Sequence, residues 1–237
     1  APLDLQEWLN ESDTYHTATI DKIIAQENIV AIIADLTPAY TNSLSGKGTF
    51  ANRTKRVKLY KRLFIHDKIN DVILIFDNVK AYKASFRKKW LLHSLSETAI
   101  NGQFFQINTP ENPALNMKGG TLKGKILLPE KFLINKIGGK GMEFYVDGVN
   151  YDENGSLFKS GNRKKNAELG KWRIELEPLS NKKEDIFFVA LQPSTKSDLV
   201  LFPDITAHFQ NSNLLIWIKG KEAIKININQ DFSSIKL

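Results

Sequence analysis

Apolar residues recur along most of the chain in two patterns, short continuous runs and strict alternation. Residues 72–76 (VILIF) form a continuous run. Runs of β-branched and aromatic residues of this length, bounded by Asp and Asn, are typical of strands buried on both faces. Residues 53–66 alternate instead, and the short segment 67–70 joins the two. We therefore predict an antiparallel hairpin over residues 53–81, with a turn at Asp77-Asn78 after the second apolar run.

The alternating segment has two chemically different faces. One is mostly apolar and carries Val57, Leu59, Lys61, Leu63 and Ile65. The other is basic and aromatic and carries Arg56, Lys58, Tyr60, Arg62, Phe64 and His66. A second segment, residues 171–178 (KWRIELEP), alternates just as strictly and predicts one buried and one solvated face. On that pattern Glu175 and Glu177 share the solvated face.

Most of the remaining sequence also has the pattern of strands separated by short turns. The expected strands cover residues 17–20, 29–34, 103–107, 120–127, 131–137, 143–149, 185–191, 199–202, 206–210, 214–219 and 223–228. Pro38, which has no amide hydrogen, ends the second of these segments. Only residues 4–11 have a helical pattern, and residues 41–52 and 152–170 are predicted loops.

These elements predict an all-β fold, a large antiparallel two-sheet β-sandwich with at most one short N-terminal helix. The prediction rests on about fifteen strands and on their alternation. We place a lead-in at residues 1–16 and one sandwich domain at residues 17–237. The glycine-rich segment 138–141 lacks the pattern of a phosphate-binding loop, and a hairpin turn that glycine permits is the preferred interpretation.

Charge narrows the choice of partner. The 237 residues include 33 Lys and Arg against 26 Asp and Glu, a formal net charge of +7 spread along the chain. Scattered positive charge favours a broad cationic face for an anionic polymer over a basic tail. Cysteine is absent, which excludes disulfides and thiolate metal sites. The N-terminal residues do not have a signal-peptide pattern, and no apolar run reaches the ~18 residues of a membrane span, so we expect no membrane partner.

The candidate functional residues lie in the segment that follows the apolar run at residues 72–76. Arg87, Lys88 and Lys89 precede Trp90, a combination of charge and aromatic surface that suits acidic sugars or nucleic acid. A simple solvated strand face explains the same residues equally well. His93 has two interpretations: an imidazole hydrogen-bonded in or near the core, or a proton carrier or sugar-binding group at the edge of a cleft. The four histidines are too far apart in sequence to suggest a metal site.

Several segments together resemble the C-terminal β-sandwich region of heparinase II/III-like polysaccharide lyases. The resemblance spans residues 35–192 and depends on the order and spacing of the segments. They are residues 35–40 (DLTPAY), 56–62, 75–79 (IFDNV), 89–93 (KWLLH), 127–129 (LLP), 137–141 (IGGKG) with 143–144, and 170–175 (GKWRIE) with Pro178.

This resemblance implies a bacterial, periplasmic or secreted enzyme that degrades uronic-acid-containing polysaccharides by β-elimination. In such lyases a base removes the C5 proton of the uronate, and an acid, often Tyr, assists the departing oxygen. Their catalytic Tyr and His come largely from an α/α-toroid domain that precedes the sandwich and is not part of this sequence. The family's upstream H-x-H segment and the zinc site of some members have no counterpart here. We therefore assign no catalytic residue, metal or cofactor.

Three functions remain open from the sequence. The preferred one is the C-terminal β-sandwich portion of a polysaccharide lyase, inactive by itself, whose partners are an acidic polysaccharide and the toroid domain of the same parent protein. Arg87, Lys89, Trp90 and His93 are the residues expected to face the substrate. The second is a non-catalytic module that binds acidic polysaccharide. Nucleic-acid binding, the third, rests on charge alone, and no nucleic-acid motif supports it.

Overall fold

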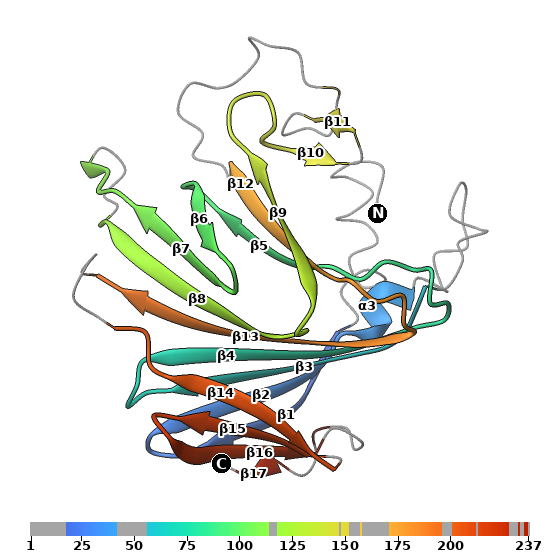
Figure 1. Cartoon of the computed structure of the whole chain (residues 1–237), viewed down its shortest axis with the longest axis vertical. Coiled ribbons are helices and arrows are strands. Elements are labelled where there is room, and N and C mark those ends of the chain that lie inside the picture. Colours follow the sequence, from blue (N-terminus) through green and yellow to red (C-terminus); the bar gives the residue numbers. More distant parts are fainter. Residues whose placement is uncertain are drawn as a thin grey trace.

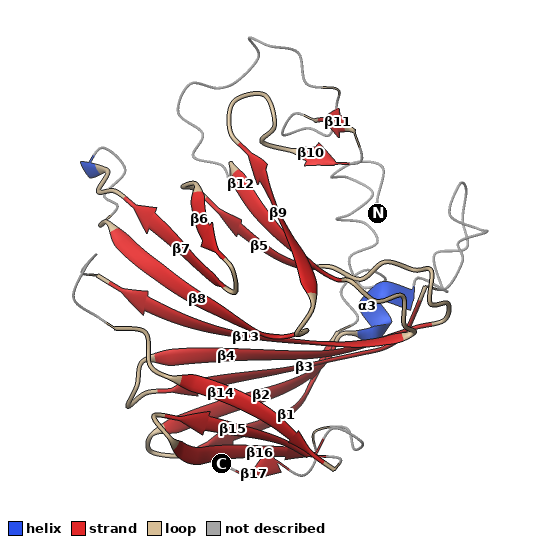
Figure 2. Ribbon diagram, viewed as in Figure 1, coloured by secondary structure: helices blue, strands red, loops and turns tan. Residues whose placement is uncertain are grey.

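The protein is an antiparallel β structure in three layers (Figures 1 and 2). The computed structural model describes residues 18–41, 56–113, 118–146, 148–151, 157, 171–195, 201–211, 213–227, 232 and 235–236. Among these residues, no helix is long and apolar enough to cross a lipid bilayer. The predicted helix at residues 4–11, the lead-in to which it belongs and most of the two predicted loops lie outside the described residues.

The middle layer is an eight-stranded antiparallel sheet. Its strands, in spatial order, are β1 (Thr19–Ala25), β2 (Ile29–Asp35), β3 (Val57–Asp67), β4 (Val72–Ala81), β13 (Glu184–Ser194), β8 (Gly120–Leu128), β7 (Phe104–Thr109) and β6 (Thr98–Asn101). The predicted hairpin is confirmed, because β3 pairs antiparallel with β4. The segment at Asp77-Asn78, however, is not a turn: β4 continues through it to Ala81.

A smaller sheet covers each face of the middle layer (Figure 1). The first small sheet consists of β5 (Trp90–Ser94), β12 (Trp172–Pro178) and β9 (Phe132–Gly138), in the order β5-β12-β9. The second consists of β14 (Ile205–Gln210), β15 (Asn213–Ile218), β16 (Lys221–Asn227) and β17 (Ile235–Lys236). A short hairpin, β10 (Tyr145–Val146) and β11 (Val149–Asn150), follows β9.

The alternation of side chains on the two central strands explains why both faces need a cover. On β4, Leu74 and Phe76 join a core with the four-stranded sheet, together with Phe188 of β13. Phe187 and Val189, on either side of Phe188 in β13, face the opposite side of the sheet and join a second core with the three-stranded sheet. The predicted antiparallel β-sandwich is confirmed, but it has three sheets where two were predicted. The three-stranded sheet covers one face of the central sheet and the four-stranded sheet covers the other.

A short helix, α3 (Thr37–Thr41), follows β2. The sequence correctly ends the strand near Pro38 but does not predict this helix. Proline is tolerated in the first turn of a helix, where its missing N–H would have no helical partner. The carboxylate of Asp35 accepts the Thr37 N–H at 2.9 Å and so satisfies one of the free donors of that turn.

The glycine-rich segment forms a turn, but the prediction that this turn closes a hairpin is wrong. Gly138, at the end of β9, has a φ of +147°, and a Cβ there would lie 2.2 Å from the backbone oxygen of Lys171. Gly139 and Gly141 also have positive φ angles, which glycine adopts without strain. The flanking strands do not pair with each other, because β9 pairs with β12 and β10 pairs with β11.

Candidate functional site

The structure buries one of the four residues expected to face a substrate and leaves the other three exposed. Trp90 is only 4% exposed and packs in the core beneath the three-stranded sheet, so the expectation that it faces a cleft is wrong. Its position at the start of β5 places it on the same face as Leu92, which also packs against that core. Arg87, Lys89 and His93 are exposed. Trp90 therefore supports β5 and has no surface to offer a ligand.

Arg87 and Lys89 belong to a group of ion pairs on the side of β12 that faces away from the central sheet. We call this group the β12 ionic cluster; it comprises Arg87, Lys89, Arg173, Glu175 and Glu177. The Arg87 guanidinium pairs with the Glu177 carboxylate through two nitrogen atoms. Glu175 accepts hydrogen bonds from Lys89 Nζ at 2.6 Å and from Arg173 Nε at 2.8 Å. Three cations thus surround two carboxylates and leave a net excess of one positive charge.

This cluster corrects the prediction that Glu175 and Glu177 are solvated. They are only 6% and 9% exposed, so both faces of β12 are buried. Hydrogen bonds from Arg87 hold the pKa of Glu177 below its ordinary value. Burial by itself would raise the pKa of Glu175, but the hydrogen bonds from Lys89 and Arg173 outweigh it and lower the pKa. Alternation along a strand cannot distinguish such a paired face from a solvated one.

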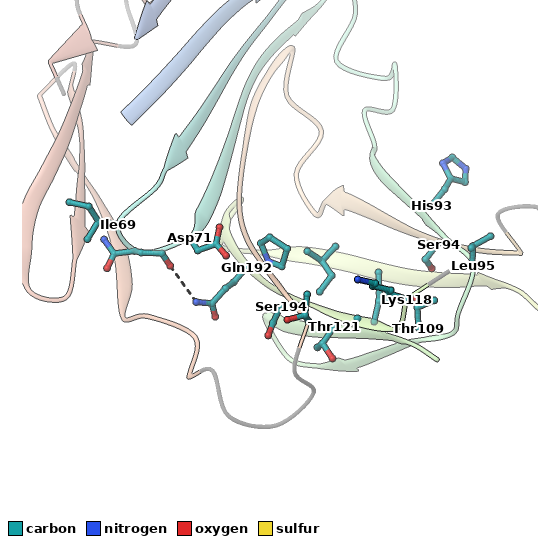
Figure 3. Close-up of a pocket in the computed structure, with 16 residues that line it drawn as sticks. Ile69, Asp71, His93, Ser94, Leu95, Thr109, Lys118, Thr121, Gln192 and Ser194 are labelled. Carbon is teal, nitrogen blue, oxygen red and sulfur yellow. Dashed lines mark hydrogen bonds between the residues drawn. The ribbon is translucent and has the colours of Figure 1, made fainter. Parts of the chain in front are cut away.

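His93 lies on the exposed side of β5, opposite Arg173 in the register of the sheet. The interpretation that places its imidazole in the core is therefore wrong. Partial burial and the positive charge of Arg173 both lower the pKa of His93, so the ring is neutral at neutral pH. His93 also stands at the rim of a cavity, with its ring turned away from most of the other lining residues (Figure 3).

A second cluster lies on the central sheet, where α3 meets β3 and β4. We call it the Arg62 cluster; it comprises Tyr40, Tyr60, Arg62 and Asp77. Asp77 is 1% exposed. Its two carboxylate oxygens accept hydrogen bonds from Arg62 Nε and Nη2, each at 2.7 Å. The Tyr60 hydroxyl accepts a further bond from Arg62 Nη2 at 2.9 Å and lies 3.3 Å from Asp77 Oδ2, to which it donates.

The helix α3 brings Tyr40 to this cluster. Leu36 N–H donates to the backbone oxygen of Tyr60, and Tyr60 N–H donates to Thr37 Oγ1, both at 2.8 Å. These bonds fasten the beginning of α3 to β3. The Tyr40 ring then lies 5.2 Å from the Tyr60 ring, between centroids, and remains 53% exposed.

The Arg62 cluster presents hydrogen-bond donors and an aromatic surface to solvent. The Arg62 side chain is 36% exposed. Arg62 Nε and Nη2 donate the hydrogen bonds to Asp77 and Tyr60. The remaining nitrogen, Nη1, makes no hydrogen bond to the described residues. Burial and the nearby Asp77 raise the pKa of Tyr60, so the phenol stays protonated. The fixed guanidinium can therefore bind a carboxylate or sulfate through Nη1, beside the exposed ring of Tyr40.

The sequence pattern predicts part of the Arg62 cluster. The basic, aromatic face predicted for residues 53–66 includes Tyr60 and Arg62. The sequence pattern places Asp77 in a turn and therefore does not predict its pairing with Arg62. Burial raises the pKa of Asp77, and the hydrogen bonds and charge of Arg62 oppose this effect. A carboxylate this deeply buried requires a cation beside it, and a buried Asp inside an apolar strand is the signal that points to one. Among the described residues, no group of His, Asp and Glu is arranged to hold a metal ion.

Fold and site together define a β-sandwich domain with a basic, aromatic surface site. No protein-family model matches the sequence, and no curated protein matches it. Solved structures do match. A heparan sulfate lyase from Pedobacter heparinus, solved as a mutant, aligns with a TM-score of 0.51 and 15% identity over 94% of this chain and 32% of its own. A heparinase III aligns with a TM-score of 0.52 and 14% identity over 88% of this chain and 27% of its own.

The same heparinase III with methylated lysines aligns with the same TM-score, at 15% identity. The chain thus has the β-sandwich fold found in heparinase III structures, and the resemblance predicted from the sequence is confirmed at the level of the fold. It spans about a third or less of the length of these structures.

Proposed function

We propose that this chain is the β-sandwich portion of a heparinase II/III-like polysaccharide lyase that acts by β-elimination on a uronic-acid-containing polysaccharide. Most of the catalytic residues would lie in an α/α-toroid domain of the same parent protein, which would be bacterial and periplasmic or secreted. The fold shared with two lyases supports this proposal, as does the fraction of their length that the chain covers.

The single observation that carries substrate binding is Nη1 of Arg62, which makes no hydrogen bond to the described residues, beside the exposed Tyr40 ring. Uronates have a planar carboxylate, which a guanidinium binds well, and an apolar face of C–H groups that can stack on an aromatic ring. Asp77 and Tyr60 hold the guanidinium in place, so little side-chain freedom is lost on binding. The β12 ionic cluster offers weaker attraction, because two carboxylates already neutralise most of its charge.

A non-catalytic module that binds acidic polysaccharide is the alternative. The Arg62 cluster supports it equally, since Arg62 and Tyr40 can hold a sugar without reacting with it. The two functions differ in one respect: only the lyase forms C4–C5 unsaturated uronates when the sandwich is part of a protein that also carries the toroid.

The test combines calorimetric titration of the 237-residue chain with a lyase assay of the parent protein. Heparin, heparan sulfate, chondroitin and alginate are the ligands, and absorbance of unsaturated uronates reports turnover. We expect the chain alone to bind one or more of these polymers without turnover. Arg62→Gln should weaken binding at least about tenfold, as expected for loss of a charge-assisted bond. Lys221→Gln, which removes an exposed charge from β16, should change it little.

The outcomes separate the possibilities. Binding by the chain together with turnover by the parent protein supports the lyase, and binding without turnover by either supports the module. If Arg87→Gln weakens binding while Arg62→Gln does not, the substrate surface is the β12 ionic cluster. Equal affinity for every polyanion, including DNA, would contradict recognition of uronate in both forms of the proposal.

A further inference from the structure

A cavity of about 780 Å³ opens at one end of the central sheet (Figure 3). Its walls come from five places in the chain: the β3–β4 turn, the ends of β5, β7 and β13, and the beginning of β8. Cavities of roughly 300–1,000 Å³ are the size of small-molecule sites in proteins. Asp71 at this end of β4 is six residues from Asp77 of the Arg62 cluster, about 20 Å along the strand. The cavity is therefore a separate location from the proposed uronate site.

The charges of the described residues that line the cavity balance. Lys118 contributes one positive charge, and it makes no ion pair with the described residues. Asp71 contributes one negative charge, and His66 Nε2 lies 3.5 Å from its carboxylate. His93 at the rim has a lowered pKa and is neutral at neutral pH. The cavity thus favours neither a cation nor an anion, in contrast to the Arg62 cluster.

The inner wall contains a polar side chain whose hydrogen bonding is incomplete. Gln192 of β13 lines the cavity and is 4% exposed. Its Nε2 donates to the backbone oxygen of Asn70 at 3.5 Å, the limit of a hydrogen bond. Its Oε1 is buried and has no donor among the described residues. A buried amide oxygen without a donor is unfavourable by about 1–3 kcal/mol, which a hydroxyl donor from a ligand would offset.

The remaining wall is mixed. Ile107, Leu122 and Pro193 supply apolar surface. The Thr121 hydroxyl donates to Asn108 Oδ1 at 3.0 Å, so its own oxygen can still accept a hydrogen bond. Hydroxyl acceptors, an amide and an apolar wall around a cavity without net charge match a molecule that has many hydroxyl groups and apolar C–H faces.

We propose that this cavity is a binding site for a neutral, polyhydroxylated ligand of one or two sugar units, with a ligand hydroxyl donating to Gln192. The site does not depend on the proposed uronate site. A protein that fails to bind acidic polysaccharide can still bind a neutral sugar here.

The test titrates the 237-residue chain with glucose, galactose, N-acetylglucosamine and their β-linked disaccharides, with glucuronate as the charged comparison. Nuclear magnetic resonance of the ¹⁵N-labelled side-chain amides is the readout. We expect saturable shifts of the Gln192 amide with at least one neutral sugar and weaker effects with glucuronate. Gln192→Leu should raise the Kd about tenfold, the effect of one lost hydrogen bond. The matched control is Gln210→Leu, because Gln210 is exposed on β14.

Folding of the variant serves as an internal check. Leucine replaces the amide with an apolar group of similar size, so Gln192→Leu should melt at or above the temperature of the parent protein. If that variant is unstable, the shift of the parental Gln192 amide still decides the question. No saturable shift with any neutral sugar, tighter binding of glucuronate than of the neutral sugars, or equal loss of affinity in Gln210→Leu would overturn the proposal and leave a hydrated cavity.

Discussion

Replacing Arg62 with Met tests whether the guanidinium is what permits Asp77 to be buried. Methionine keeps much of the apolar stem but removes the two hydrogen bonds to Asp77 and the positive charge. Removing one partner of a buried ion pair typically destabilises a protein by about 3–5 kcal/mol. The Arg62 side chain is 36% exposed, so solvent screens part of this interaction and we expect the lower end of that range at pH 7.

Protonation limits the loss and makes it depend on pH. Burial raises the pKa of Asp77 above its ordinary value of 3.8 even beside Arg62, and removing the guanidinium takes away the charge and hydrogen bonds that oppose this rise. The folded state then binds a proton that the unfolded state has released, so stability falls as pH rises from 3.8 towards the new pKa. Protonating such a group requires about 1.4 kcal/mol per pH unit above 3.8, or about 4.4 kcal/mol at pH 7. At pH 4 the same term is about 0.3 kcal/mol, and the lost hydrogen bonds dominate.

Urea denaturation at pH 4 and pH 7 measures this prediction. We expect Arg62→Met to lose about 3 kcal/mol at pH 7 and less than about 2 kcal/mol at pH 4, relative to the parent protein. The control is Lys80→Met, because the Lys80 and Glu184 side chains of that ion pair are 39% and 43% exposed and a surface pair contributes about 0–1 kcal/mol. Adding Asp77→Leu to Arg62→Met should recover most of the stability at pH 7. Equal losses at both pH values, or no recovery in the double variant, would refute the reasoning.

Three further predictions concern the sandwich itself. The Glu175→Gln/Glu177→Gln variant should melt at a lower temperature than the parent protein, with the largest difference near pH 7 and a smaller one as pH falls below 4.5. Both glutamates have lowered pKa values, so the stability they contribute is present above pH 4.5 and is lost as pH falls. A difference that does not change with pH would contradict the assigned ion pairs. Gly138→Ala should destabilise by at least about 2 kcal/mol in urea denaturation, since its Cβ would meet backbone, whereas Gly102→Ala, in open space, should lose about 1–2 kcal/mol. Trp90→Ala should cost about 3–5 kcal/mol of stability; a loss of sugar affinity at temperatures where the variant is fully folded would mean that its ring contacts ligand after all.

The sequence by itself determined the strand class, the hairpin of β3 and β4, and the presence of a turn after β9, but not that the strands flanking this turn pair with other strands. These features depend on local chemistry: the two-residue period of apolar side chains, and backbone angles that only glycine adopts readily. The continuous apolar run at the start of β4 correctly indicated a strand covered on both faces. The matched segments were sufficient for the resemblance to the lyase sandwich, even though the sequence identity to the solved structures is only 14–15%.

Only the tertiary structure decided which polar groups are paired and which remain free. Arg87 and Glu177 are 90 residues apart in sequence, and Lys89 and Glu175 are 86 apart, yet each pair meets on β12. Alternation predicts that two side chains share a face but not what covers that face, so it wrongly predicts that these glutamates are solvated. The sequence also wrongly predicts a turn at Asp77. A buried charge is stable only beside its counter-charge, and which cation reaches Asp77 depends on the register of β3 against β4. That register pairs Arg62 with Asp77.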